Sequence, residues 1–138
     1  MDGLFVFGGE QVFVERGQDI WSLDAPNARF RDWLHSFAWL RDLLAADPEQ
    51  AAARARALMD GWLAHFGKWD RTAWSAGPTA RRTYFWLADA PTLFPDSDPD
   101  SPARLDALAR HARHLEHLIS LPLDEHDSFS VAVALAAP

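Results

Sequence analysis

The sequence contains no cysteine and no run of eighteen or more apolar residues. Without cysteine there can be no disulfide bond, no thiolate nucleophile and no zinc site built on thiolates. Without a long apolar run, no transmembrane helix is expected. The first residues, Met1 to Phe5, also lack the basic region and apolar stretch of a secretory signal. We therefore predict no membrane insertion and no encoded export, and the compartment stays unknown.

Positive charge is also scarce, because 13 Lys and Arg residues face 20 Asp and Glu residues, giving a net charge of −7. Nucleic-acid binding depends on Lys and Arg neutralising phosphates, so no nucleic-acid partner is expected. The chain has 138 residues, of which 49% are hydrophobic. This length and composition predict one structural domain with a packed core.

Residues 1–26 are predicted to form a short β-hairpin and a connector. Residues 4–14 read LFVFGGEQVFV, which is two β-branched and aromatic runs on either side of Gly8 and Gly9. Paired glycines supply the positive φ angles of a tight hairpin turn. A lone ribbon is only marginally stable, so we expect it to lie against the helices that follow.

Residues 27–138 are predicted to be helical, which makes the fold mainly all-α. Apolar residues recur every three or four positions in four segments. Asn27, Asp47 and Ser101 provide caps for three of the helices, and Pro91 is expected to end the third one. The short link between the first two helices predicts an antiparallel hairpin. The predicted helices cover residues 30–44, 48–66, 78–89 and 101–119.

The closing segment, residues 126–138, has a mixed pattern that alternates like a strand but is rich in alanine. We interpret it as a short apolar helix. One such helix cannot shield its own apolar surface, so it is expected to pack against a missing C-terminal region or a partner protein.

Four motifs occur together in an order and spacing found in one known family. They are Leu34-His35-Ser36-Phe37-Ala38-Trp39-Leu40, Gly61-Trp62-Leu63, the loop from Trp69 to Trp74, and Ala80-Arg81-Arg82-Thr83-Tyr84-Phe85-Trp86-Leu87. With the preceding hairpin and the Val131-Ala132-Val133-Ala134-Leu135 ending, the chain resembles the N-terminal helical region of heparinase II/III-like proteins. The resemblance implies part of an α/α toroid, a ring of antiparallel helix pairs. It also implies polysaccharide lyase chemistry on uronic-acid polymers, with an anionic polysaccharide or oligosaccharide as partner.

The sequence departs from this family where catalysis would be placed. In the family, Asn, His and Tyr residues neutralise the uronate carboxylate, remove the proton and protonate the leaving oxygen. Near the closing segment, where the family has an Asn-His pair, this chain reads Glu125-His126-Asp127-Ser128. The chain also stops before the family's downstream tyrosine and histidine. We therefore predict no catalytic residue, no cofactor and no lyase activity from this chain alone.

Arg81, Arg82 and Trp86 form the first candidate group for binding a substrate. A guanidinium group binds a carboxylate or sulfate through two hydrogen bonds, and an indole face can stack on a sugar ring. Helical spacing places Arg82 and Trp86 on one face. The alternative is structural, with Trp86 in the core and the arginines paired with acids or helix ends.

His35 and Trp39 form the second candidate group, because they lie four residues apart on the first predicted helix. His35 could orient a carboxylate or act as a base near neutral pH. The alternative is a hydrogen-bonded structural histidine, since the sequence shows no partner of the kind that catalysis requires.

His111, His114 and His117 recur every three residues and raise the question of a metal site. Over six residues a helix rotates by roughly 600°, so the outer two directions diverge by about 120°. The interleaved Arg110 and Arg113 are typical of a solvated face. We therefore predict no metal site.

Seven tryptophans in a chain of this length suggest either a dense core or a ligand surface. Trp33 and Trp62 fall on apolar stripes and are predicted to be core residues. Trp21, Trp69 and Trp74 lie in connectors and are the freer candidates for contacting a ligand.

Two functions follow from these patterns. The first is the N-terminal helical portion of a heparinase II/III-like lyase, which shapes an anionic-glycan cleft without a complete catalytic site. It expects Arg81, Arg82 and a loop tryptophan to converge on a concave surface. The alternative is a non-enzymatic helical interaction or scaffold module, which expects an apolar patch on a flat or convex surface.

Overall fold

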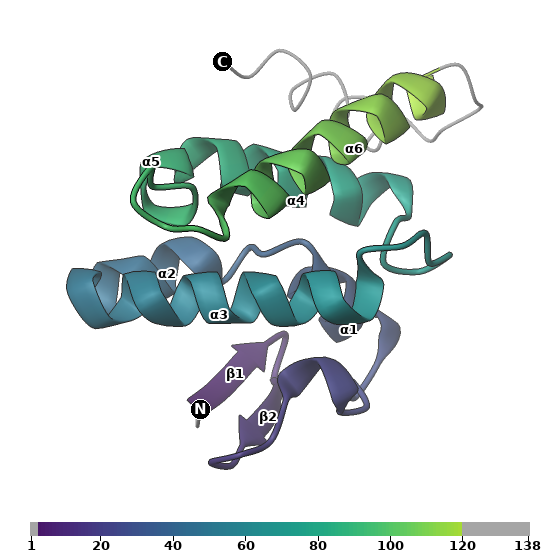
Figure 1. The fold of residues 1–138 in the computed structure, drawn as a ribbon. Helices are drawn as coiled ribbons and strands as arrows, with labels where there is room; N and C mark the ends of the chain where they lie inside the picture. Colours follow the sequence, from purple (N-terminus) through teal and green to yellow (C-terminus); the bar gives the residue numbers. More distant parts are fainter. Residues whose placement is uncertain (1–2, 120–138) are drawn as a thin grey trace.

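The computed structural model describes residues 3–119, which form a two-stranded hairpin followed by α-helices in two layers (Figure 1). The hairpin lies on one side of α3, and α4 and α6 lie on its other side. The predicted closing helix, residues 126–138, lies outside the described residues. In chain order the elements are β1 (Gly3–Phe7), β2 (Glu10–Val14), the 3-10 helix η1 (Ile20–Ser22), α1 (Ala28–His35), α2 (Leu40–Ala46), α3 (Pro48–Phe66), α4 (Ala76–Ala88), α5 (Ala90–Leu93) and α6 (Ser101–Ile119).

The predicted hairpin is confirmed. Gly8 and Gly9 have φ angles of 61° and 84°, which two successive residues in a tight primed turn require. β1 and β2 pair as antiparallel strands, and their inner face packs on the helices. The Phe5 ring, for example, meets the Trp39 ring edge-on, with 5.7 Å between centroids.

Two of the predicted N-cap residues cap the starts of helices. The Asn27 side chain accepts a hydrogen bond from the Phe30 amide at 2.8 Å, at the start of α1. Asp47 accepts from the Gln50 amide, and Pro48 follows it at a position where a missing N–H costs nothing. Asp47 alone separates α2 from α3, so α3 runs back past α2 toward α1 (Figure 1).

The prediction of one continuous helix over 30–44 is wrong, because the chain breaks between α1 and α2. Phe37 lies in the break with φ of 59°, a left-handed conformation that costs roughly 1–2 kcal/mol for a residue with a Cβ. The break turns its ring into the core, where it stacks on Trp21 and meets Trp62 and Trp86 edge-on. These ring contacts offset the backbone cost.

The third predicted helix starts earlier than expected and ends within one residue of the predicted position. α4 begins at Ala76 rather than at Pro78, and it ends at Ala88, before Pro91. The sequence did not predict that Pro91 also lies in the first turn of a further short helix, α5. A proline there loses no hydrogen bond, because the first amides of a helix have no partner within it.

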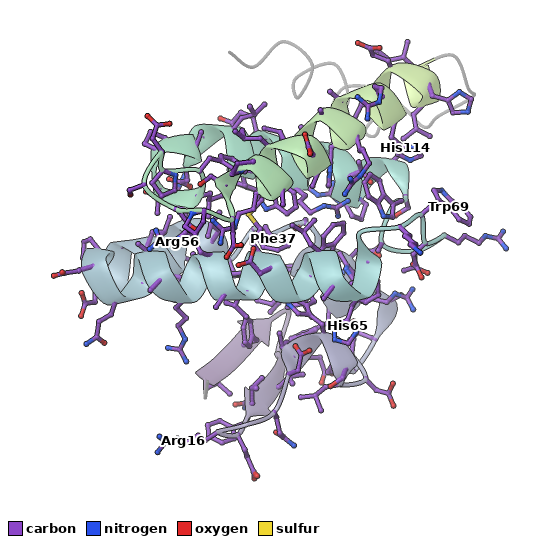
Figure 2. The ribbon with its side chains drawn as sticks, viewed as in Figure 1. Arg16, Phe37, Arg56, His65, Trp69 and His114 are labelled. Carbon is purple, nitrogen blue, oxygen red and sulfur yellow. The ribbon has the colours of Figure 1, made fainter. Side chains whose placement is uncertain are left out.

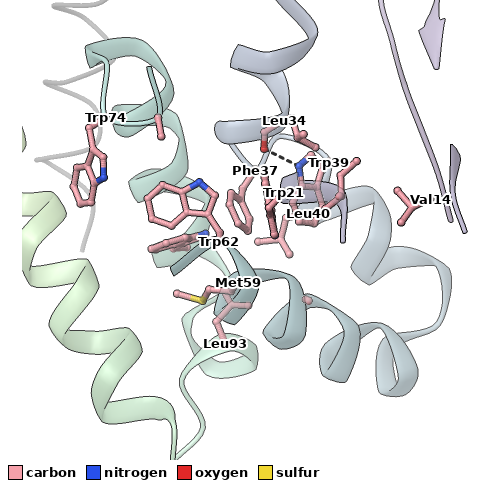
Figure 3. Close-up of a cluster of buried hydrophobic side chains, with 14 of the residues drawn as sticks. Val14, Trp21, Leu34, Phe37, Trp39, Leu40, Met59, Trp62, Trp74 and Leu93 are labelled. Carbon is pink, nitrogen blue, oxygen red and sulfur yellow. Dashed lines mark hydrogen bonds between the residues drawn. The ribbon is translucent and has the colours of Figure 1, made fainter. Parts of the chain in front are cut away.

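The core is an aromatic cluster between the two helical layers (Figure 3). Trp62 of α3 and Trp86 of α4 are 0% exposed, and Phe37 is 1% exposed. Leu115 of α6 belongs to a smaller buried cluster against α4. The paired helices therefore bury their apolar stripes against one another as the sequence predicts. No helix among residues 3–119 is long and apolar enough to cross a membrane.

Candidate functional site

Arg82 lies at the centre of the core and is 0% exposed. Its Nε donates to His111 Nε2 at 2.8 Å. Its Nη1 donates to the carbonyl oxygens of His35 and Ala73 at 2.9 and 3.0 Å, and Nη2 donates to Thr79 Oγ1 at 3.4 Å. One side chain thus joins α4 to α1, to the loop before α4 and to α6.

Three tryptophan rings surround this guanidinium group. Its Cζ lies 4.1 Å from the centroid of Trp62, 5.5 Å from Trp74 and 5.9 Å from Trp86. No ion pair among the described residues includes Arg82. Carbonyl dipoles and ring faces therefore take the place of a carboxylate. We name Arg82, Trp62, Trp74, Trp86 and His111 the buried arginine cluster.

Burial sets the protonation of the groups around Arg82. Burial lowers the pKa of Arg82 itself, and it lowers the pKa of His111, with the Arg82 charge as the second cause. A neutral His111 fits its contacts, because Nε2 accepts from Arg82 while Nδ1 donates to the Ala107 carbonyl at 2.7 Å. The hydrogen bonds therefore assign the tautomer of His111.

His35 and Trp39 are also enclosed, each with 6% of its surface exposed. Burial, followed by the Arg82 charge, lowers the pKa of His35 from 6.5 to about 4. Its Nδ1 accepts a hydrogen bond from Trp62 Nε1 at 3.1 Å. The Trp39 indole donates to the Leu34 carbonyl at 3.0 Å. Both side chains make the contacts of structural residues.

The predicted substrate-binding residues are therefore placed mostly inside the molecule. Arg82, Trp86, His35 and Trp39 are buried, and Arg81 on α4 is half-buried. Helical spacing does put Arg82 and Trp86 on one face of α4, but that face packs against α1 and α6. In this conformation a polysaccharide has no access to the four buried side chains.

The three histidines of α6 do not converge. His111 is buried against Arg82, whereas His114 Nε2 lies 2.9 Å from the Trp74 carbonyl oxygen and is half-exposed. Within residues 3–119, no group of three or more His, Asp and Glu side chains is arranged to hold a metal ion.

The three tryptophans of the connectors also differ in their exposure to solvent. Trp21 and Trp74 are buried, with indole N–H groups bonded to the carbonyls of Leu58 and Phe66 at 2.9 and 2.7 Å. Trp69 is 69% exposed. Of the three candidates for a ligand surface, Trp69 is the one that reaches solvent.

Trp69 borders a hollow of about 840 Å³ at the end of the molecule where α3 stops. Figure 2 shows Trp69 at the same end of the molecule as His114 and His65. Lys68 and Arg110, both exposed, also line the hollow. No Asp or Glu is among the described lining residues, which are Leu63, Ala64, His65, Gly67, Lys68, Trp69, Trp74, Arg110 and His114. We call this site the basic hollow.

Local structure holds the loop that carries Trp69. Asp70 Oδ1 accepts from the amides of Thr72 and Ala73 at 3.0 and 2.9 Å, which closes a turn directly after Trp69. The Trp74 indole donates to both the Phe66 and Lys68 carbonyls, so it fastens the loop to the end of α3. The backbone below Trp69 is thereby fixed, while its ring projects outward.

The sequence reasoning singled out Trp69 but missed Lys68 and Arg110. Lys68 is adjacent to Trp69 in a loop after a helix, which is a local signal for an exposed cation beside an aromatic ring. Arg110 lies on α6, more than forty positions along the chain. Only the packing of α6 beside the end of α3 brings it to the hollow.

Comparison with known proteins relates the chain to part of a longer bacterial protein. No family model matches the chain, and no solved structure matches it. The chain is 36% identical over 123 residues to a protein of Caulobacter vibrioides called FtsZ-localized protein C. The match covers 88% of this chain and 21% of that relative, so the chain spans about a fifth of the relative's length.

Proposed function

We propose that this chain is a helical protein-interaction module of the cell-division machinery, and that its basic hollow receives an acidic segment of a partner. Similarity to FtsZ-localized protein C over most of the chain supports a role in division. The sequence-based alternative, a non-enzymatic interaction module, agrees with this similarity. FtsZ is the first partner to test.

The observation that carries the proposal is a hollow with cations and an exposed tryptophan but no carboxylate in its described lining. The chain as a whole has a net charge of −7, so this local excess of Lys68 and Arg110 is unusual for the molecule. At physiological ionic strength, charges farther away than about 8 Å are largely screened. The local cations therefore set the attraction for an incoming acid.

Trp69 supplies the apolar part of the contact. Binding energy at interfaces concentrates in a few Trp, Tyr and Arg side chains that are enclosed by the partner. Trp69 is exposed, and Arg110 lines the same hollow. Because Trp74 and Asp70 fix the loop, little backbone ordering would be needed on binding, which favours affinity.

The test is the affinity of the purified chain for Caulobacter vibrioides FtsZ, measured by fluorescence anisotropy over a range of salt concentrations. We expect the double variant Lys68→Glu, Arg110→Glu to bind at least tenfold more weakly than the unchanged chain. The matched control, Arg16→Glu with Arg41→Glu, reverses two exposed charges outside the hollow and should bind normally. Equal loss in both double variants would refute a specific role for the hollow.

A second candidate function keeps the hollow but changes its ligand to an anionic glycan. The resemblance to heparinase II/III-like proteins favours it, as does an exposed indole beside two cations. In this proposal the helices belong to an incomplete α/α toroid that the rest of a longer protein completes. The chain would then shape one wall of a glycan cleft without catalysing elimination.

Titration with a uronate hexasaccharide, followed by tryptophan fluorescence, separates the two ligands. Trp69 is the exposed indole at the hollow, so glycan stacking should change its emission, and Trp69→Phe should remove most of that change. No response at millimolar hexasaccharide would reject the glycan proposal. Ultraviolet detection should show no unsaturated uronate product from the chain alone.

A further inference from the structure

We propose that the free edge of β1 and the pocket beside it form a second docking site, which binds an extended segment of a partner protein. This segment would carry a large apolar residue and an Asp or Glu two positions apart. The inference rests on the proposed role as an interaction module, but it concerns a different surface from the basic hollow.

The first observation is the open edge of the hairpin. Among residues 3–119, β1 pairs with β2 alone. The Phe7–Glu10 pair closes the two-residue turn and is hydrogen-bonded, and hydrogen-bonded pairs alternate with non-hydrogen-bonded pairs along the ladder. Leu4 and Val6 therefore direct their backbone N–H and C=O groups away from β2. Such an edge is a ready template for an added strand.

The second observation is an apolar outer face on the same hairpin. Leu4, Val6 and Phe13 are 55%, 54% and 60% exposed, and Leu4 lies directly opposite Phe13 in the strand register. A strand added beside β1 would place its outward side chains next to Leu4 and Val6. The outer face therefore favours an occupant with β-branched or apolar residues.

The third observation is a pocket of about 570 Å³ between β1 and the helices α2 and α3. Its apolar lining residues include Trp21, Trp33, Trp39, Leu43 and Leu58. Inward side chains of an added strand would point into this space, because successive residues of a strand alternate between its faces. The volume accommodates a large apolar side chain.

Contacts within the chain hold Trp21 in the pocket wall. The Trp21 indole donates to the Leu58 carbonyl at 2.9 Å, which holds its ring against α3. Gly61 allows this approach, since a Cβ there would lie 3.0 Å from Trp21 Cδ1. A preformed pocket binds a ligand with little loss of side-chain conformational entropy.

The fourth observation is a cation that has no partner among residues 3–119. Arg54 of α3 lines the pocket, is half-buried, and makes no hydrogen bond or ion pair with another described residue. Its guanidinium lies against Gly3, where a Cβ would be 3.1 Å from Nη2. A carboxylate at the Gly3 end of the added strand would pair with it.

The position of Arg54 sets the spacing in the ligand. The apolar residue and the acid both face the pocket, so an even number of positions separates them. The pocket borders β1 from Gly3 to Val6, and a spacing of two residues, about 6.6 Å along a strand, fits this length. The two acids that line the pocket do not form an ion pair with Arg54. Asp19 bonds the Trp21 amide and His65, and Asp42 is exposed in the first turn of α2.

The experiment screens a display library of random twelve-residue peptides. Peptides are selected for binding to the variant that carries Lys68→Glu and Arg110→Glu. These changes reverse both exposed cations of the basic hollow, so the peptides selected on this variant report on other surfaces. The outcome therefore does not depend on the result for FtsZ. We expect enriched peptides to share a large apolar residue two positions from an Asp or Glu. No enrichment of this spacing would overturn the proposal.

The best peptide is then synthesised and titrated against further variants. Arg54→Glu should weaken binding at least tenfold, whereas Arg41→Glu, an exposed charge outside the pocket, should leave it unchanged. Methylating the peptide amides that face β1 should abolish binding, and methylating the alternate amides should not. This comparison needs no change in the protein, so it stays decisive where a hairpin variant fails to fold.

Two results would contradict the proposal directly. One is binding that is unaffected by both Arg54→Glu and amide methylation. The other is a dimer of the unchanged chain in sedimentation that disappears with Val6→Pro, because a second copy would then occupy the edge. A monomer at micromolar concentration, with the peptide binding as described, supports the assignment.

Discussion

The buried arginine cluster and the basic hollow contain the same kinds of side chain but differ in their exposure to solvent. Each combines a cation, an indole ring and a histidine, and Trp74 belongs to both. Trp62 and Trp86 of the cluster are 0% exposed, whereas Trp69 of the hollow is 69% exposed. The comparison teaches that an Arg-Trp motif describes chemistry, while packing decides whether a ligand can reach it.

A third region shows that an internal arginine has more than one structural solution. Arg104 of α6 is 2% exposed, like Arg82, but it bonds both Asp60 oxygens and Asp98, each at 2.7 Å. These acids raise the pKa of Arg104, whereas burial lowers that of Arg82. Arg104 thus ties α6 to α3 through charge, and Arg82 ties α4 to its neighbours through carbonyls and rings.

The largest effect is expected for Arg82→Ala. The change leaves two carbonyls and His111 without their donor inside the core, and buried groups that lose a charged partner cost about 3–5 kcal/mol. Urea unfolding at pH 7.5 measures the loss in the free energy of unfolding. A loss below about 1 kcal/mol would mean that the cluster contributes little to stability.

A smaller loss is expected for Arg104→Ala. Its bonds to Asp60 are with a carboxylate that is 42% exposed and can be solvated by water after the change. We therefore expect about 2 kcal/mol, in line with hydrogen bonds to charged groups. The same urea experiment applies, and Arg113→Ala, an exposed change on the same helix, should stay within about 0.5 kcal/mol.

Acid should destabilise the fold through His35, whose Nδ1 accepts a hydrogen bond from Trp62 of the buried arginine cluster. The pKa of His35 is about 4 in the folded chain and 6.5 when unperturbed, so the unfolded chain binds more protons between these values. The stability that neutral His35 contributes is therefore present above pH 6.5 and is lost as the pH falls toward 4. From pH 7 to pH 5 the loss is about 2 kcal/mol from His35.

The lowered pKa of His111 adds to the acid loss in the same direction. Urea unfolding at a series of pH values measures it, with His35→Gln as the comparison. The variant should lose less stability between pH 7 and pH 5 than the unchanged chain does. Identical pH profiles for the two proteins would contradict the assignment of His35 as a buried neutral group.

The smallest effect on stability is expected at the hollow itself. Trp69→Ala removes an exposed side chain, so the free energy of unfolding should change by less than about 0.5 kcal/mol. Binding of FtsZ should nevertheless weaken at least tenfold. A large loss of stability in this variant would show that Trp69 packs in the structure rather than serving a partner.

Local signals predicted much of the fold. Gly8 and Gly9 indicated the hairpin, and Asn27 and Asp47 marked helix starts, because these features act over a few residues. The break at Phe37 could not be predicted this way. Its left-handed backbone is favourable only because Trp21, Trp62 and Trp86, from three distant segments, receive the ring.

The candidate site was harder to predict for a related reason. Helical spacing correctly placed Arg82 and Trp86 on one face, but spacing alone does not say whether that face meets solvent or another helix. The hollow depends on Lys68 and Arg110, which come together only when α6 packs beside the end of α3. Pairs separated by this much chain leave no periodic pattern in a single sequence.

The most direct test of the account follows a fluorescent fusion of the chain in Caulobacter vibrioides cells that carry labelled FtsZ. The unchanged chain and the Arg16→Glu, Arg41→Glu control should overlap with FtsZ. The Lys68→Glu, Arg110→Glu variant, equally stable when purified, should be spread through the cell. Overlap with FtsZ that survives reversal of both hollow charges would contradict the claim that the basic hollow is the surface that binds FtsZ.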